Sequence, residues 1–110
     1  MNPFGKGLWG EMRAARYVKK RGMHILERRY RTAHGEIDLI VRDGDALVFM
    51  EVKARTAGRL GDGALAVNAE KRRHLRYAAQ RYLLSHPAER IRFDVIEITA
   101  SGIRHIPHAF

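Results

Sequence analysis

Cysteine is absent from the 110-residue chain, so neither a disulfide nor a thiolate metal site can form. Long apolar runs are also missing, because the longest, Ala46 to Met50, is far shorter than the roughly 20 residues that span a bilayer. The first residues contain no apolar signal region. These absences favour a protein of the reducing cytoplasm without a membrane partner, and the length suits one domain over residues 1–110.

Acidic residues are scarce relative to basic ones. Twelve Asp and Glu against 21 Lys and Arg give a formal charge of +9. Such an excess indicates a polyanionic partner, and DNA is the leading candidate, with RNA as an open alternative. Charge alone does not separate these from a ribosome surface or anionic lipid.

Apolar periodicity predicts an α/β fold with the element order α-β-β-β-α-β-β. Residues 1–7 lack a periodic pattern and are expected to form a loose leader. A first helix is predicted from Leu8 to Lys20, ending at Gly22. Its buried face is predicted to carry Leu8, Met12, Ala15 and Val18 or Lys19.

Strand patterns and one further helix account for the rest of the chain. Asn68 is the predicted N-cap of that helix, which runs from Ala69 to about Ser85 and ends before Pro87. The predicted strands are His24–Arg31, which is basic and suits a sheet edge, Glu36–Arg42, Leu47–Lys53, Ile91–Thr99 and Ile103–Ile106.

The second and third strands form a hairpin with acids at unusual positions, G-E-I-D-L-I-V-R-D-G-D-A-L-V-F-M-E-V-K-A-R from residue 35 to 55. Strict alternation is predicted to put Ile37, Leu39 and Val41 on one face. Depending on which residues form the turn, Glu51 lies opposite Glu36 or opposite Asp38. Both registers place the three carboxylates on one face with Lys53.

Two interpretations of this acidic face remain open. Close carboxylates on a mostly buried sheet repel one another and need a compensating cation. Mg²⁺ or Mn²⁺ would supply it, polarise a phosphodiester and activate water, with Lys53 stabilising developing negative charge. Alternatively, Lys53 forms an ordinary ion network with the acids, and spacing alone favours this because acid-x-Lys is common.

Motifs across nearly the whole chain resemble one family. They are G-x-x-G-E-x-x-A-A from Gly7, G-E-I-D-L-I, E-V-K-A-R placed 13 residues beyond Asp38, A-A-Q-R-Y-L and R-F-D-V-I. Together they resemble the YraN-like bacterial family of the PD-(D/E)xK nuclease superfamily. The resemblance implies a restriction-endonuclease-like core, with a mixed sheet flanked by helices, and similarity to archaeal Holliday-junction resolvases.

The same resemblance implies roles for particular residues. Asp38 and Glu51 would bind Mg²⁺ or Mn²⁺, and Lys53 would be the catalytic lysine. Glu11 would complete the site as a further catalytic acid and metal ligand. For Glu36 two roles remain open, that of a metal ligand and that of a residue that supports the ligands.

Two residues depart from the family pattern, and one matching residue is interpreted differently. Ala54 stands where Thr is usual, and Arg29 stands where Asn is common. Asp94 matches R-F-D-V-I but is expected to anchor a turn or an arginine rather than a metal.

Basic residues beside the predicted site are candidates for phosphate contact. Arg55 and Arg59 flank a glycine-containing loop, while Lys71 and Arg72 open the second helix, where a solvated face is the alternative. The sequence therefore predicts a metal-dependent DNA endonuclease, with branched or damaged DNA among its candidate substrates. The alternative is a nucleic-acid-binding protein that retains the fold without cutting. A form that cuts both strands is expected to be a homodimer, because one domain supplies one metal site.

Overall fold

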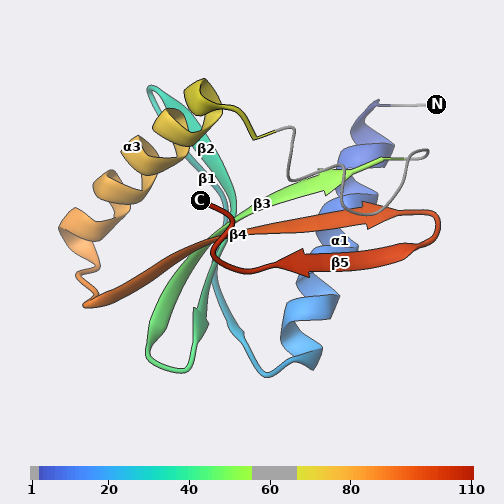
Figure 1. Ribbon diagram of the computed structural model, residues 1–110, viewed down its shortest axis with the longest axis horizontal. Helices are drawn as coiled ribbons and strands as arrows, with labels where there is room; N and C mark the ends of the chain where they lie inside the picture. The colour runs from blue at the N-terminus through green and yellow to red at the C-terminus, as the bar shows by residue number, and fades with distance from the viewer. Residues whose placement is uncertain (1–2, 56–66) are drawn as a thin grey trace.

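The computed structural model describes residues 3–55 and 67–110, and over them the predicted element order is confirmed. The protein is a mixed α/β fold, in which β3 and β4 pair in parallel and the other neighbouring strands are antiparallel. Figure 1 shows the twisted sheet with α3 to one side of it and α1 to the other. The elements are α1 (Pro3–Lys20), β1 (His24–Thr32), β2 (Gly35–Asp43), β3 (Ala46–Ala54), α3 (Ala69–Ser85), β4 (Arg90–Thr99) and β5 (Gly102–Ile106), and the strands lie in the order β1-β2-β3-β4-β5.

Two apolar clusters fill the space on either side of the sheet. Phe49 of β3 packs with the buried residues of α3, whereas its neighbours Val48 and Met50 pack with those of α1. This alternation shows that the two helices cover opposite faces of the central strands. Among the described residues, no helix is long and apolar enough to cross a membrane.

The hairpin turn selects one of the two registers that the sequence left open. Asp43 pairs with Ala46, so Gly44 and Asp45 form the loop, and Gly44 takes a φ of 63° that suits glycine. The recorded pairing continues to Leu39 and Met50. The pairing ends there, one residue before Asp38 on β2 and one residue before Glu51 on β3, so the two acids lie at the same end of the paired strands.

The predicted strict alternation along β2 is wrong at Asp38. Ile37 packs in the cluster beneath α3, whereas Leu39 packs in the cluster beneath α1. On β1, Arg29 lies opposite this point, because Arg28 pairs with Leu39 and Tyr30 with Ile37. Arg29 has a φ of 52°, a left-handed conformation that Asn tolerates better than Arg. Both strands therefore change face at the position of the candidate aspartate.

Helix α1 differs from the prediction in its start and in its buried face. It begins at Pro3, within the segment expected to be a loose leader, and proline suits the first helical turn. Ala15 and Val18 are buried as predicted, whereas Leu8 and Met12 are 51% and 58% exposed. The contact face instead includes Gly10, where an added Cβ would lie 2.5 Å from Ala54 Cβ. Small residues let the helix approach β3 closely, and this approach sets its rotation.

Helix α3 matches its predicted limits. The Asn68 side-chain oxygen accepts a hydrogen bond of 2.9 Å from the backbone N–H of Lys71, as expected of an N-cap. The basic strand β1 lies at the sheet edge, as predicted. The cap matters for the site because it determines where the first turn of α3 begins.

Candidate active site

Glu51 on β3 is the most deeply buried member of the predicted site, with 5% of its surface exposed. Its Oε1 lies 3.6 Å from Lys53 Nζ and 3.4 Å from Lys71 Nζ. Its Oε2 is buried and has no hydrogen-bond partner among the described residues. One oxygen thus receives two ammonium groups, while the other retains its full capacity to bind a cation or a donor.

Asp38 lies beside Glu51 at the point where β2 changes face. Its Oδ2 accepts a hydrogen bond of 2.8 Å from the Val52 backbone N–H, so the side chain occupies a donor of the neighbouring strand. Burial and then the negative charge of Glu51 raise the pKa of Asp38 from 3.8 to about 7. The Val52 hydrogen bond and the charge of Lys71 lower the pKa, but by less. Burial and the nearby charge of Glu51 therefore oppose the ionisation of Asp38.

Lys71 enters the site from the first turn of α3. The sequence analysis predicted that Lys71 contacts phosphate. In the structure its ammonium group lies slightly closer to Glu51 than the ammonium group of Lys53. Its charge also acts on Asp38. The structure thus brings Asp38, Glu51, Lys53 and Lys71 together from two strands and a helix.

Glu11 lies on α1 and is engaged by Arg29. Both of its carboxylate oxygens accept hydrogen bonds from Arg29 Nε, at 2.9 and 2.7 Å. The pKa of Arg29 is raised by Glu11 first, and also by the charges of Glu36 and Asp38. Arg29 is therefore paired with Glu11 and lies near enough to Asp38 and Glu36 for their charges to act on it. Glu36 is at the rim, with Oε1 3.5 Å from Arg31 Nε.

Glu97 is a buried acid that the sequence analysis missed. It is fully buried on β4, and its backbone is in register with Lys53. Its Oε2 accepts a hydrogen bond of 3.1 Å from the guanidinium group of Arg55, a predicted phosphate contact. The signal in the sequence was a single acid inside the apolar run V-I-E-I. By accepting this hydrogen bond, Glu97 holds the Arg55 side chain against the sheet. Arg55 follows Lys53 by two residues, so the two side chains lie on the same face.

The other predicted phosphate contacts have different surroundings. Arg72 donates a hydrogen bond of 3.0 Å to the Val67 carbonyl oxygen, and its guanidinium carbon lies 5.4 Å from the centre of the Phe110 ring. These contacts tie the start of α3 to the end of the chain. Arg59 lies outside the described residues.

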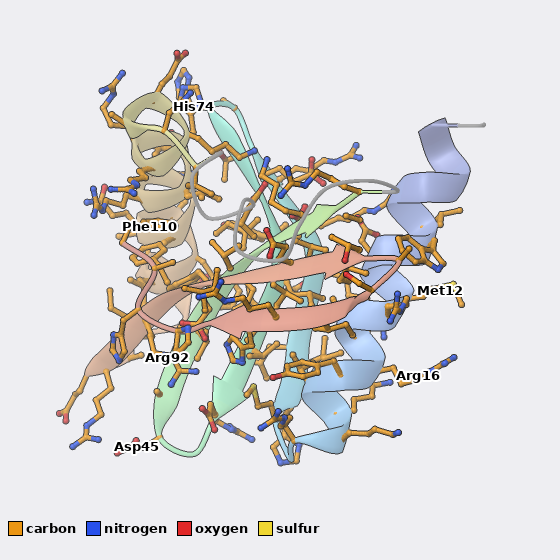
Figure 2. All side chains as sticks on the ribbon, turned by 45° about the vertical axis from the view of Figure 1, so that its right-hand side comes forward. Met12, Arg16, Asp45, His74, Arg92 and Phe110 are labelled. Carbon is orange, nitrogen blue, oxygen red and sulfur yellow. The ribbon has the colours of Figure 1, made fainter. Side chains whose placement is uncertain are left out.

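Asp94 anchors an arginine and a turn, as predicted. It accepts hydrogen bonds from Arg92, from His105 Nε2 at 2.6 Å and from the backbone N–H of His108 at 3.1 Å. Burial pushes the pKa of Asp94 upward, but the hydrogen bonds from His105 and Arg92 outweigh it, so the pKa is lowered. Figure 2 labels Arg92 on β4, whose guanidinium also bonds Asp43 at 3.1 Å.

The site offers carboxylate oxygens, the donors that a hard divalent cation prefers. Within residues 3–55 and 67–110, no three His, Asp or Glu side chains are grouped so that they could hold a metal ion. Mg²⁺, however, is commonly held by one or two carboxylates, with waters and substrate phosphate oxygens completing its octahedron. Asp38 provides one of these carboxylates and Glu51 the other, whose Oε2 accepts no hydrogen bond from the part of the chain that the structure describes. The residues present therefore fit a magnesium-type ion.

Residues 10–98 match the family described as "Uncharacterised protein family UPF0102". The chain belongs to this family. It is the YraN family that the motifs predicted. The UPF0102 match extends over every described residue of the site, from Glu11 on α1 to Glu97 on β4.

Relatives with the UPF0102 name align along almost their full length. The UPF0102 protein of Dechloromonas aromatica is 43% identical over 105 residues, covering 96% of this chain and 88% of the relative. That of Syntrophomonas wolfei is 44% identical over 110 residues, covering 94% and 96%. That of Geobacter metallireducens is 44% identical over 110 residues, covering 94% and 90%.

Proposed function

We propose that this protein is a divalent-metal-dependent nuclease, built on a restriction-endonuclease-like core, that hydrolyses phosphodiester bonds in DNA. The observation that carries the proposal is the pair formed by Glu51 and Asp38. Glu51 has a buried oxygen that finds no hydrogen-bond partner within residues 3–55 and 67–110, and Asp38 has a pKa raised to about 7 in part by the charge of Glu51. A cation between them would relieve both costs at once.

Asp38 and Glu51 are the residues that would hold Mg²⁺ or Mn²⁺. When bound, such an ion supplies Lewis-acid polarisation of a phosphate oxygen and lowers the pKa of a water molecule. Lys53 is placed on the same strand face as Glu51, where its ammonium group would stabilise negative charge that develops on the phosphate. Lys71 would hold Glu51 and contact the same phosphate from the helix side.

Glu11 has a conditional role in this proposal. Its two oxygens are paired with Arg29, so it would join a metal site only if that pair separated. Arg29 lies beside Asp38, and a cation at the carboxylates would repel its guanidinium group. Metal binding would then favour the separation of Glu11 from Arg29, and that separation would in turn favour metal binding.

DNA is the proposed substrate because the formal charge is +9 and basic side chains surround the carboxylates. Arg55, Lys71 and Arg72 lie at or near the site, and Arg59 belongs to the same proposed set. A cytoplasmic location, where DNA and Mg²⁺ are both available, is part of the proposal.

A second candidate function is nucleic-acid binding without cleavage. It is favoured by the ion pairs, because Glu51 already has two ammonium partners and Glu11 has a guanidinium partner. In that case the acids would serve to position Lys53, Lys71 and Arg29 for contact with phosphates.

A cleavage assay with labelled nucleic acids decides between these functions. Linear duplex, nicked, branched and single-stranded DNA, and RNA, would be incubated with Mn²⁺ and wild-type protein, Asp38→Ala or Asp45→Ala. Asp45 is a suitable control because it is an acid at the hairpin turn with a side chain that is 75% exposed. The nuclease proposal expects metal-dependent cleavage by wild type and Asp45→Ala, and none by Asp38→Ala. Binding without cleavage of any substrate would leave the second function.

A further inference from the structure

The outer face of α1 is apolar toward its start and basic toward its end. Leu8, Trp9 and Met12 are 51%, 36% and 58% exposed. Arg16, Lys19 and Lys20 follow and are also exposed. At about 100° of rotation per residue, these positions fall within an arc of about 120°. Figure 2 shows Met12 and Arg16 extending from α1 away from the rest of the molecule.

A pocket of about 270 Å³ lies between this face and β5. Three of its lining residues are cationic, namely Arg13, Arg16 and Lys20. The other two, Tyr17 and Ile103, are uncharged, and none is acidic. Because three like charges on one helix repel one another, an anion in the pocket would stabilise them. The pocket is therefore suited to a phosphate group.

The pocket and the apolar patch are joined through Arg13. Its guanidinium carbon lies 5.0 Å from the centre of the Trp9 ring, and its Nη1 donates to the Thr99 carbonyl oxygen at 3.4 Å. Arg13 is thus held between the strand end and the indole. A ligand that reaches both regions must carry negative charge and flat apolar surface within about two helical turns.

We propose that this face of α1, with the α1–β5 pocket, binds single-stranded nucleic acid. Phosphates would enter the pocket beside Arg13, Arg16 and Lys20, and unpaired bases would stack on Trp9 and pack on Met12. A duplex offers the phosphates but keeps its base faces inside the stack, so it would use the pocket alone. Contact with a second copy is disfavoured because a two-fold interface would bring two cationic rows together.

The position of α1 links this surface to the carboxylates. Glu11 lies on the same helix but reaches toward Arg29, opposite Asp38. From Glu11 to Lys20 the helix rises by only about 13 Å, a span of a few nucleotides. The inference rests on the proposed function in that α1 would hold an unpaired segment next to the site of cleavage.

The test measures fluorescence anisotropy of a labelled oligothymidine strand and of a duplex of equal length, in EDTA and at several salt concentrations. Arg16→Gln with Lys20→Gln should lower single-strand affinity about tenfold and reduce the slope of log K against log salt by about 1.4, which corresponds to two phosphate contacts. The matched control, Arg81→Gln with Arg90→Gln, removes the same charge from exposed positions on α3 and β4 and should change affinity less than about twofold.

Trp9→Ala separates stacking from charge. It should weaken single-strand binding about fivefold or more and leave duplex binding unchanged, with thermal unfolding confirming an intact fold. The inference would be overturned if the Arg16/Lys20 variant and the Arg81/Arg90 control lost single-strand affinity equally. It would also be overturned if Trp9→Ala weakened single-strand and duplex binding equally. Sedimentation showing that wild type dimerises and Trp9→Ala does not would likewise overturn it, as would tighter binding to phosphatidylglycerol vesicles than to either oligonucleotide.

The outcome also separates this inference from the nuclease proposal. If the protein cuts DNA with Mn²⁺ but substitution of Arg16, Lys20 and Trp9 leaves its single-strand affinity unchanged, only the inference about α1 is refuted. If single-strand binding depends on these residues but the protein cuts no substrate, only the nuclease proposal is refuted.

Discussion

An Asp38→Asn variant tests the electrostatics of the candidate site, because it removes one charge while keeping nearly the same shape. In the folded protein the pKa of Asp38 is about 7, against an ordinary value of 3.8. Between these two pH values the folded state holds a proton that the unfolded state has lost. The contribution of Asp38 to stability is therefore fully present below about pH 4 and is lost as the pH rises through 7.

The size of the effect follows from the pKa difference. A pKa of about 7 in the folded state against 3.8 in the unfolded state corresponds to about 4 kcal/mol in total, and between pH 5 and pH 8 the loss is about 2–3 kcal/mol. This is a large share of the 5–15 kcal/mol that is usual for a domain. Asparagine does not titrate, so Asp38→Asn should become more stable than wild type by this amount over the same interval.

Urea unfolding at pH 5 and pH 8 in EDTA measures the difference, with Asp45→Asn as the exposed-acid control. Histidine titration is common to all three proteins and cancels in the comparison. Mn²⁺ at pH 8 should stabilise wild type and Asp45→Asn but not Asp38→Asn, since a ligand of the folded state raises its stability. Parallel pH profiles for wild type and Asp38→Asn would refute the proposed burial and repulsion of these carboxylates.

Four further outcomes are expected. Lys53→Ala should abolish Mn²⁺-dependent cleavage while leaving folding and DNA affinity nearly intact, and cleavage at the wild-type rate would show Lys53 to be only an ion-pair partner. If Lys53→Arg is also inactive, a tightly positioned or proton-transferring amine is indicated rather than diffuse charge. Gly10→Ala should lower stability by about 1–3 kcal/mol because its Cβ would lie 2.5 Å from Ala54 Cβ, whereas Gly7→Ala meets nothing within 4 Å and should be neutral or stabilising in chemical unfolding. DNA affinity should fall steeply between low and physiological salt, and a flat response in anisotropy titrations would count against both functions. A form that cuts both strands should sediment as a dimer with DNA, whereas a strict monomer would be limited to nicking, single-strand cutting or binding.

Local features of the chain could be predicted because their causes lie within a few residues. The Asn68 cap and the period of the apolar residues determine α3, and the Asp43-Gly44-Asp45 sequence determines a tight hairpin. The parity of side chains along β3 places Glu51 and Lys53 on one face whichever residues form the turn. The motifs that resemble the YraN-like family also lie in the sequence itself, and the UPF0102 match agrees with them.

Tertiary contacts decided what the local pattern could not. The apolar residues of α1 predicted its buried face only in part, because Ala15 and Val18 are buried but the helix turns Gly10 toward β3 and leaves Leu8 and Met12 exposed. Hydrophobicity indicates which residues gain from burial, but steric fit determines how closely a helix can approach a strand, and only the partner surface sets that fit.

The composition of the site depended on the fold in the same way. Lys71 and Glu97 are far from Glu51 in the sequence. Taken locally, Lys71 is an ordinary lysine on a helix surface, and Glu97 is a single acid in an apolar strand. The crossover through α3 brings Lys71 to Glu51, and the parallel pairing of β3 with β4 brings Glu97 beside Lys53. Charges interact through space at distances of a few ångströms, so the electrostatic character of this site was determined only when the chain had folded.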